Sequence, residues 1–401
     1  MIAAIDKRPG LLRYNEASCR QNPQINGGRA YRQCTLSLMD TISDPNISFD
    51  ANGISNYYYE YQEAEKTYVR HGKEGEAALN KLLSEIKEKG AGKKYDCITG
   101  VSGGVDSTYL SYMAKQWGLN PLVVHFDNGW NSELAVKNIE NIISRLGFDL
   151  YTLVVDWEEF KDIQLSYFKA SVVDIEAITD HAIVATLHKL AHQYGIKYIL
   201  SGNNIVTEAT LPKHWIWNKS DHVNLRDIHR KHGSVPLKTF PLFTTRLKKM
   251  SKMKSVEVVY PLNFVYYNKA EAKKTIIEKL EWRDYGGKHY ESVFTRFYQG
   301  YILPVKFHID KRKAHLSNLI FSGQIDKHQA LEEIQTPIYD EEVFQSDYEF
   351  VLKKLGFTEA EFNEWLLQPR HEHSEYATEQ SVWDKYWLLR PFKKIRHSFA
   401  Q

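Results

Sequence analysis

The middle third of the chain alternates short apolar runs with longer segments in which apolar residues recur at three- and four-residue steps. The short runs are typical of buried strands and the longer segments of helices. The strands are expected at residues 95–99, 122–126, 151–155 and 197–201. Ser132 can cap one of the helices, and Gly118, Gly147 and Gly195 follow the ends of others. Repeated strand–helix–strand units predict an α/β fold, a parallel-sheet α/β/α sandwich with helices on both faces.

The two flanks of this alternating segment have different patterns. Residues 1–60 show little periodicity and predict loops and short strands. Residues 61–90 are charged and helical in pattern, one further strand is expected at 256–262, and the chain beyond about 265 is helical and charged. We therefore divide the chain into an N-terminal lobe (1–90), a sheet domain (91–264) and a helical, substrate-facing C-terminal region (265–401).

Composition narrows the class of protein. Of the 401 residues, 43% are hydrophobic and 25% charged, as in a globular protein of roughly two or three domains. The formal net charge of +2 lacks the basic surplus typical of nucleic-acid binding. Three cysteines cannot form a disulfide framework, and no apolar stretch suits a signal peptide or a membrane-spanning helix. We expect a cytoplasmic protein that binds no nucleic acid and inserts into no membrane.

The most informative segment follows the first predicted strand and opens a helix. It runs from Ser102 through Gly103, Gly104, Val105 and Asp106 to Ser107. Adjacent glycines let the backbone approach a ligand closely, and the N–H groups at the start of a helix attract an anion. The Asp106 carboxylate would repel bare phosphate, which favours a bridging cation, most simply Mg²⁺. The alternative is an ordinary glycine turn in which Asp and Ser cap the helix.

This loop lacks the Gly-Lys-Ser/Thr of a P-loop and the Gly-x-Gly-x-x-Gly of dinucleotide-binding folds. It resembles the PP-loop of the ATP pyrophosphatases, S-G-G-x-D-S. The resemblance implies an adenine nucleotide α-hydrolase-like sandwich that binds ATP and Mg²⁺ and splits ATP into AMP and pyrophosphate. It also implies nucleotide or substrate contacts at the ends of the second and fourth strands, from His125, Asp127, Gly202, Asn203 and Asn204. Turn chemistry is the alternative for these polar residues.

Three further segments extend the resemblance over roughly residues 30–335. They are 32–57, 282–300 and 309–317, and they resemble the N-acetyl sugar amidotransferases. That family implies an ATP-dependent ligase that converts an acetamido group of a bacterial surface sugar to an acetamidino group. The sugar is expected to be nucleotide-linked, for lipopolysaccharide O-antigen or nonulosonic acid glycans. Adenylation of the amide oxygen would give an imidate, from which ammonia expels AMP.

One part of the family pattern is degenerate in this chain. The family often has two C-x-x-C pairs, which form a plausible zinc knuckle, but the four positions here are Cys34, Ser37, Ser55 and Tyr58. Hydroxyl groups are poor zinc ligands, and one thiolate cannot hold a structural zinc. We therefore expect no zinc there, and we expect packing, with Tyr57 among the residues involved, to hold the N-terminal lobe.

Charge stabilisation near the α-phosphate calls for a basic group. The resemblance offers four candidates, each of which could equally belong to a solvated helix face: Lys288, Arg296, Lys311 and Arg312.

A nitrogen source is also needed. Glutaminases use a cysteine nucleophile at a processed N-terminus or on a strand–turn–helix elbow. Residue 2 is Ile2, and Cys19, Cys34 and Cys97 all lack that context. We therefore expect ammonia from a separate glutaminase subunit, and the resemblance adds a cyclase-like subunit as a second partner.

Three other functions remain open on the sequence. A tRNA thiolase would share the loop, but it normally needs a reactive cysteine, and Cys97 lies inside a strand. A synthetase that amidates a carboxylate would also share the loop, because the loop does not reveal the acceptor. A non-catalytic ATP-binding module would not need the Asp106 carboxylate.

Overall fold

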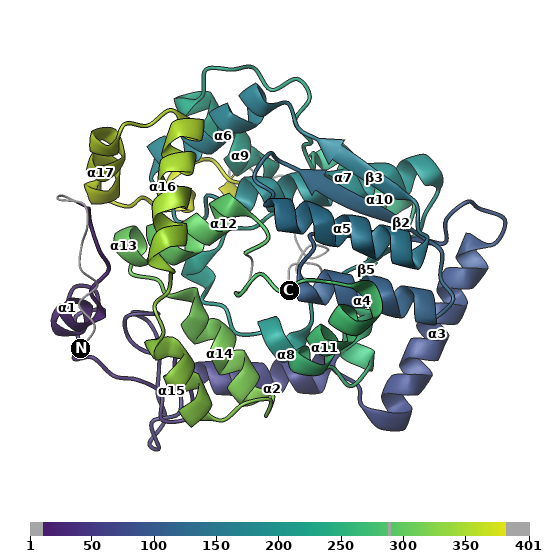
Figure 1. Cartoon of the computed structure of the whole chain (residues 1–401), viewed down its shortest axis with the longest axis horizontal. Helices are drawn as coiled ribbons and strands as arrows, with labels where there is room; N and C mark the ends of the chain where they lie inside the picture. Colours follow the sequence, from purple (N-terminus) through teal and green to yellow (C-terminus); the bar gives the residue numbers. More distant parts are fainter. Residues whose placement is uncertain (1–10, 288–289, 382–401) are drawn as a thin grey trace.

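The computed structural model describes residues 11–287 and 290–381 (Figure 1). Five parallel strands form one sheet in the order β3-β2-β1-β4-β5. They are β1 (Cys97–Gly100), β2 (Pro121–Asp127), β3 (Leu150–Val154), β4 (Tyr198–Leu200) and β5 (Glu257–Val259). The α/β class and the parallel sheet predicted from the sequence are confirmed.

The strand order creates one topological switch point. The chain adds β2 and β3 on one side of β1 and then returns to place β4 and β5 on the other side. Ligands of open α/β sheets bind outside the carboxyl ends of the strands at such a point. The Ser102–Ser107 loop follows β1, and residues 201–204 follow β4. Two of the segments predicted to bind ligand therefore meet at the switch point.

Helices cover both faces of the sheet, as predicted. On one face, Val123 packs with Ile139 and Ile142 of α5 (Glu133–Leu146) and with Ile276 of α11 (Lys269–Leu280). On the other face, Ile98 and Leu122 pack with Leu190 of α7 (Ala177–Tyr194). Beside them, α3 (Gly72–Gly90) packs against α4 (Val105–Gln116). The predicted helix ends are confirmed, because the Ser132 side chain caps α5 and Gly147 and Gly195 adopt left-handed conformations.

Half of the remaining helical elements lie in the described part of the C-terminal region, which is helical as predicted. In Figure 1, helices α12 to α17 lie to the left of the sheet. The remaining elements are α1 (Glu16–Gln21), α2 (Asn56–Tyr68), α6 (Trp157–Ala170), α8 (Ile205–Glu208), η1 (Lys213–Trp215), α9 (His222–His232), α10 (Thr245–Met253), η2 (Pro261–Phe264), α12 (Val293–Phe297), η3 (Tyr298–Ile302), α13 (Leu303–Phe307), α14 (Lys311–Phe321), α15 (Lys327–Gln335), α16 (Glu341–Leu355), α17 (Glu359–Leu367) and η4 (His373–Glu375).

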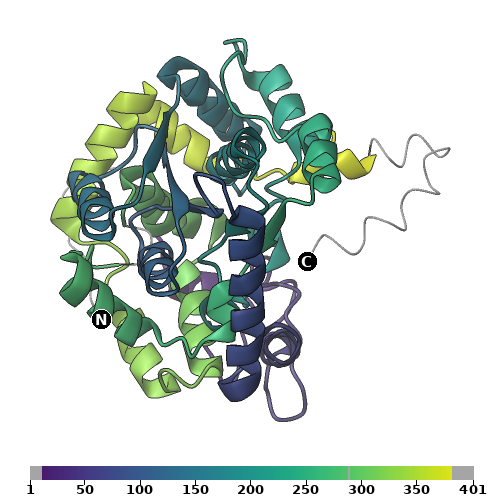
Figure 2. The ribbon, with the colours of Figure 1, turned by 90° about the vertical axis from the view of Figure 1, so that its right-hand side faces the viewer.

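Two details differ from the sequence expectation. The helical pattern of residues 61–90 belongs to two helices, because the chain leaves α2 at Val69 and the Arg70 N–H donates to the Asn263 carbonyl. Figure 2 shows α2 nearly end-on beside the upright α3. Strand β3 is not covered on both faces, since Leu150 is 40% and Val154 67% exposed. Its apolar sequence is typical of a buried strand, but β3 lies at the edge of the sheet, where some of its side chains are exposed to solvent.

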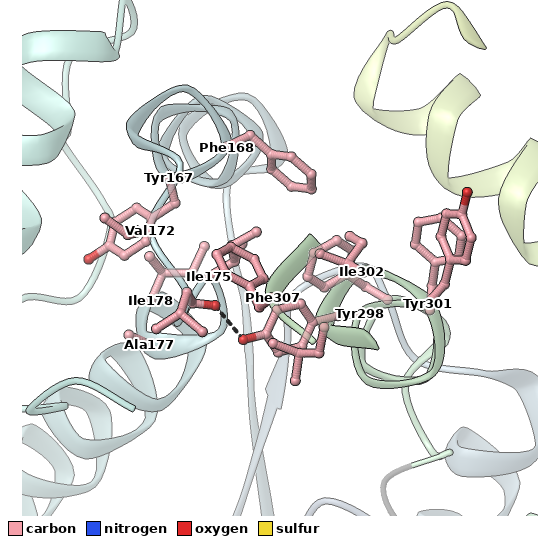
Figure 3. Close-up of a cluster of buried hydrophobic side chains, with 14 of the residues drawn as sticks. Tyr167, Phe168, Val172, Ile175, Ala177, Ile178, Tyr298, Tyr301, Ile302 and Phe307 are labelled. Carbon is pink, nitrogen blue, oxygen red and sulfur yellow. Dashed lines mark hydrogen bonds between the residues drawn. The ribbon is translucent and has the colours of Figure 1, made fainter. Parts of the chain in front are cut away.

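The largest apolar core joins parts of the chain that are far apart in the sequence. It contains Met39 from the N-terminal lobe, Phe126 from β2 and Phe297 from the C-terminal region. Figure 3 shows Tyr298 facing Ile178 of α7 in this core, and the Tyr298 hydroxyl donates to the Val173 carbonyl (2.6 Å). The C-terminal region is therefore packed directly on the start of α7. The three-domain boundaries stay a prediction.

Among the described helices, none combines the length and the apolar character that crossing a membrane requires.

Candidate active site

The Ser102–Ser107 segment forms a turn between β1 and α4, as the sequence predicts. Gly103 has a φ of +86°, a conformation that favours glycine. The Ser102 hydroxyl accepts a hydrogen bond from the Gly104 N–H (3.2 Å) and lies 3.2 Å from the Ser107 hydroxyl oxygen. Gly104 is the N-cap of α4 and has no side chain to cap it. The Val105 and Asp106 N–H groups find no acceptor among the described residues, so the first turn of α4 presents open donors to an anion.

The segment after β4 lies directly against this turn. A Cβ atom at Gly202 would lie 3.1 Å from the Asp106 carbonyl carbon and 3.1 Å from the Ser107 nitrogen. A larger residue at this position would require the loop backbone to move by a few tenths of an ångström. Asn204 is buried and caps α8 through its Oδ1, which accepts from the Thr207 N–H (3.0 Å). Asn203 is exposed, so of the two asparagines it is the one whose side chain faces solvent.

The end of β2 is tied to the loop by His125. Its Nδ1 hydrogen-bonds to the carbonyl of Val101, which directly precedes the loop (3.1 Å), and its Nε2 accepts from the Asn131 side-chain amide (3.1 Å). The same amide group donates to Asp127 (3.1 Å). Burial lowers the pKa of His125, which favours the neutral ring that these bonds require. The structure thus brings His125 and Asp127 to the switch point, where their contact with a nucleotide stays a prediction.

Two carboxylates lie beside the open donors of the loop. Asp106 is in the first turn of α4, and the Tyr267 hydroxyl donates a hydrogen bond to its Oδ1. Glu291 approaches from the C-terminal region, with its Oε1 3.2 Å from the position of a Cβ at Gly104. Carboxylate and phosphate oxygens are the ligands that Mg²⁺ prefers. The loop donors and these two carboxylates therefore fit an ATP phosphate chain with Mg²⁺.

Two aromatic residues hydrogen-bond to the backbone of the loop. The Trp282 indole N–H and the Tyr285 hydroxyl donate to the Gly103 carbonyl, at 2.7 and 3.1 Å. Between them, Arg283 exchanges two backbone–side-chain hydrogen bonds with Asn138 of α5, each 2.8 Å long. The sequence alone predicts no role for Trp282, Tyr285 or Tyr267. Trp282 and Tyr285 lie in segment 282–300, which carries the family resemblance, but an aromatic residue by itself ordinarily indicates core, and no pattern in the sequence points to Tyr267.

The chain is similar to several known proteins. Residues 291–390 match the family model described as "LPS biosynthesis protein WbpG-like, C-terminal domain". An uncharacterized protein of Methanocaldococcus jannaschii is 23% identical over 275 residues, which are 67% of this chain and 81% of that protein. A tRNA(Ile)-lysidine synthase of Chlamydia pneumoniae is 38% identical over 76 residues, 18% of this chain and 23% of that protein.

The chain is related to the PP-loop ATP pyrophosphatases and to WbpG-like proteins of lipopolysaccharide biosynthesis. A tRNA-specific 2-thiouridylase of Clostridioides difficile is a further relative, 22% identical over 240 residues, 53% of this chain and 63% of that protein. Among solved structures, an NMN synthetase of Francisella tularensis aligns with a TM-score of 0.36 and 13% identity, covering 74% of this chain and 99% of that one. The sequence relatives confirm the resemblance to PP-loop enzymes.

Two of the four basic candidates are paired with carboxylates that are not part of the PP-loop. Arg296 makes a two-pronged ion pair with Asp347, with N–O distances of 2.6 and 3.0 Å. Arg312 pairs with Asp310 (2.8 Å) and donates to two backbone carbonyls near the end of α15. Guanidinium groups engaged in this way primarily fix the packing of the C-terminal helices. Lys288 lies outside the described residues.

Lys311 has a different environment from the two arginines. It is the first residue of α14, is partly buried, and makes no hydrogen bond or ion pair with any described residue. Burial lowers the pKa of its amino group, although the carboxylates of Glu176, Asp174 and Asp180 oppose this effect. Lys219 already pairs with Asp174 (2.5 Å) and Asp180 (3.2 Å). Of the three described candidates, Lys311 is therefore the one that makes no hydrogen bond or ion pair with another described residue.

Three of the four knuckle positions lie close together in the N-terminal lobe. Cys34 is fully buried and its sulfur accepts from the Ser55 N–H (3.3 Å). Burial raises the pKa of the Cys34 thiol, but hydrogen bonds from Ser37 and Ser55 outweigh that effect and lower it. Tyr58 instead packs its ring on Phe321, at 5.5 Å between centroids. Cys34, Ser37 and Ser55 therefore lie close together, and the Ser55 N–H is hydrogen-bonded to the Cys34 sulfur.

We predict that the purified protein contains no stoichiometric zinc, because only one of the converging side chains is a zinc ligand of normal strength. Elemental analysis of the full chain measures this directly. One zinc per chain that disappears in Cys34→Ser would contradict the prediction.

Proposed function

We propose that this chain is an ATP-dependent N-acetyl sugar amidotransferase. It would convert an acetamido group of a nucleotide-linked bacterial surface sugar to an acetamidino group and release AMP and pyrophosphate. The observation that carries the proposal is the contact between two parts of the chain. The open PP-loop meets Glu291, which begins the segment that matches WbpG-like lipopolysaccharide biosynthesis proteins.

The geometry suits a positioning and electrostatic role for the protein. The N–H groups of the first turn of α4 would hold the β- and γ-phosphates, while Asp106 and Glu291 would hold Mg²⁺, which neutralises phosphate charge when bound. The amide oxygen of the sugar attacks the α-phosphorus and pyrophosphate leaves. Ammonia then adds to the imidate carbon and AMP leaves with the former amide oxygen.

We assign the basic role near the α-phosphate to Lys311 rather than to Arg296 or Arg312. Its support is the absence of a partner among the described residues, whereas both arginines are paired. A lysine with an open amino group can approach a phosphate as a point charge.

Nitrogen is proposed to come from a separate glutaminase subunit, together with a cyclase-like subunit. Cys97 is fully buried, and burial raises the pKa of its thiol. Cys19 does lie near a histidine, with 3.7 Å between its sulfur and the His308 Nδ1. Burial raises the pKa of Cys19 and lowers that of His308. Both shifts favour the neutral forms, whereas a catalytic cysteine needs the thiolate.

We predict that the isolated chain uses ammonium but not glutamine. With ATP, Mg²⁺, sugar acceptor and glutamine alone, glutamate release should stay at background. The same mixture with ammonium should give product. Glutamate release at the rate of product formation would contradict the prediction. If that glutamate release then disappeared in Cys19→Ser but not in Cys34→Ser, Cys19 would be the nucleophile.

A tRNA-modifying function is the second candidate, because two of the relatives are tRNA-modifying enzymes by name. The experiment that separates the functions supplies ATP, Mg²⁺ and ammonium with a panel of diacetamido sugar nucleotides, and in parallel with tRNA. Exchange of one oxygen for NH in a sugar nucleotide, read by mass spectrometry, supports the proposal. Three other outcomes would contradict the proposal. Modification of tRNA alone would indicate a tRNA-modifying enzyme, amidation of a carboxylate an amidating synthetase, and ATP binding without pyrophosphate release a non-catalytic module.

A further inference from the structure

We infer that Trp282 and Tyr285 are positioning residues that fix the Gly103–Gly104 peptide and thereby set how tightly the PP-loop binds pyrophosphate. The inference rests on the proposed ATP chemistry. It adds two residues to the site that act through the loop backbone and do not themselves touch the nucleotide.

The first step concerns the direction of one peptide group. A carbonyl oxygen can accept two hydrogen bonds, and the Gly103 oxygen accepts one from the Trp282 indole and one from the Tyr285 hydroxyl. In a planar trans peptide the N–H points opposite to the C=O. Drawing the Gly103 oxygen toward the aromatic pair therefore turns the Gly104 N–H toward Ser102, where it donates to the hydroxyl.

The second step concerns what the oxygen would otherwise do. Gly103 and Gly104 have no side chains, so this peptide has an unusually low barrier to reorientation. A Gly103 carbonyl turned toward α4 could accept from the Asp106 or Ser107 N–H, as in an ordinary helix start. Those N–H groups are among the donors that the loop offers to phosphate. The aromatic pair thus keeps the donors of α4 available.

The third step concerns how firmly the pair is held. Trp282 is 2% exposed and packs with Ile139, Ile142 and Ile276 between α5 and α11. Its ring meets that of Tyr285 edge-on, at 5.4 Å between centroids and 84°. The Tyr285 hydroxyl also lies 2.7 Å from the position of a Cβ at Gly103. The two donors are therefore fixed by the core of the sheet domain, and they fit only a glycine at residue 103.

Two conservative variants test the inference, Trp282→Phe and Tyr285→Phe, each of which removes one donor and keeps an aromatic ring. A matched control is Trp365→Phe, because the Trp365 indole also donates to a backbone carbonyl, that of Phe168 (2.6 Å), and is 4% exposed. Calorimetry on the full chain measures the affinities for Mg²⁺–pyrophosphate and for AMP, and thermal unfolding is followed in parallel.

We expect each loop variant to bind Mg²⁺–pyrophosphate about tenfold more weakly, the size of one lost hydrogen bond, with AMP affinity unchanged. Trp365→Phe should lower thermal stability without changing either affinity.

Unchanged pyrophosphate affinity in both loop variants would overturn the inference. Parallel losses for pyrophosphate and AMP would also overturn it, since they indicate general destabilisation. If the wild-type chain binds neither pyrophosphate nor ATP, the proposed function itself fails. Tyr285 is only partly buried, so Tyr285→Phe keeps the test available if Trp282→Phe does not fold.

Discussion

Replacing Asp106 by asparagine is expected to lower the rate of pyrophosphate release by at least about a hundredfold, the scale on which loss of one charge-stabilising group acts. Asp106 lies in the first turn of α4 among donors that face phosphate. A carboxylate in that place contributes only if a cation bridges it to the phosphates. Asparagine keeps the shape of the side chain and can still accept the Tyr267 hydrogen bond, but it loses the charge. Enzymatic detection of pyrophosphate measures the effect.

Two further variants make the Asp106 result specific. Asp106→Ala would leave the buried Tyr267 hydroxyl without its acceptor, which costs about 1–3 kcal/mol of stability. A lower activity in this variant would therefore combine the effect of lost stability with the effect of the lost carboxylate. Tyr267→Phe removes the donor and leaves the charge, and we expect it to retain most of the activity. Ser107→Ala should weaken ATP binding only mildly, since backbone N–H groups supply most of the donors. Pyrophosphate release by Asp106→Asn at the wild-type rate would refute the assignment.

Acidification from pH 7 to pH 4.5 is expected to lower the free energy of unfolding by several kcal/mol. Burial lowers the pKa of His181, His188 and His373 to about 4. The unfolded value is about 6.5, so the folded state favours the neutral rings. Their contribution to stability is complete above pH 6.5 and is lost as the pH falls toward 4. Each histidine accounts for about 3 kcal/mol over that window.

The contacts of His181 explain the direction of the shift. Its Nδ1 hydrogen-bonds to the Lys219 carbonyl (2.8 Å), and its Nε2 accepts from the Phe243 N–H (2.9 Å). Protonation of Nε2 would place two donors against each other in a buried site. The Nε2 of His373 is buried and has no hydrogen-bond partner among the described residues, so a proton there would also lack an acceptor.

Urea unfolding at several pH values tests this expectation in wild type and His181→Asn. The variant should be less stable at pH 7, because it loses the bond to Phe243. Its free energy of unfolding should fall less steeply between pH 6.5 and 4, by up to about 1.4 kcal/mol per pH unit, the equivalent of one proton. His328→Asn is the matched control, since the His328 side chain is 81% exposed. Parallel pH curves for wild type and His181→Asn would show that another group carries the dependence.

Local pattern was enough to predict the elements that position the PP-loop. Apolar runs located the five strands, and Ser132, Gly147 and Gly195 marked helix ends correctly, because capping depends on residues that are adjacent in the chain. The pattern of residues 61–90 did not show the break between α2 and α3, where Gly72 has a φ of +57° and the Arg70 N–H donates to the carbonyl of the distant Asn263. The exposure of β3 was also hidden, since strand order is a property of the whole sheet.

The sequence by itself determined the α/β class, the PP-loop from Ser102 to Ser107 and its relatives, since these depend on local spacing and residue type. Only the tertiary structure brought Tyr267, Trp282, Tyr285 and Glu291 to that loop. The tertiary structure also distinguished Lys311 from the other two described basic candidates, because Arg296 and Arg312 each pair with a carboxylate. The physical reason is that a charge or a hydrogen-bond donor acts only on groups within a few ångströms of it. Residues 161 to 182 positions apart in the chain become neighbours only when the chain packs.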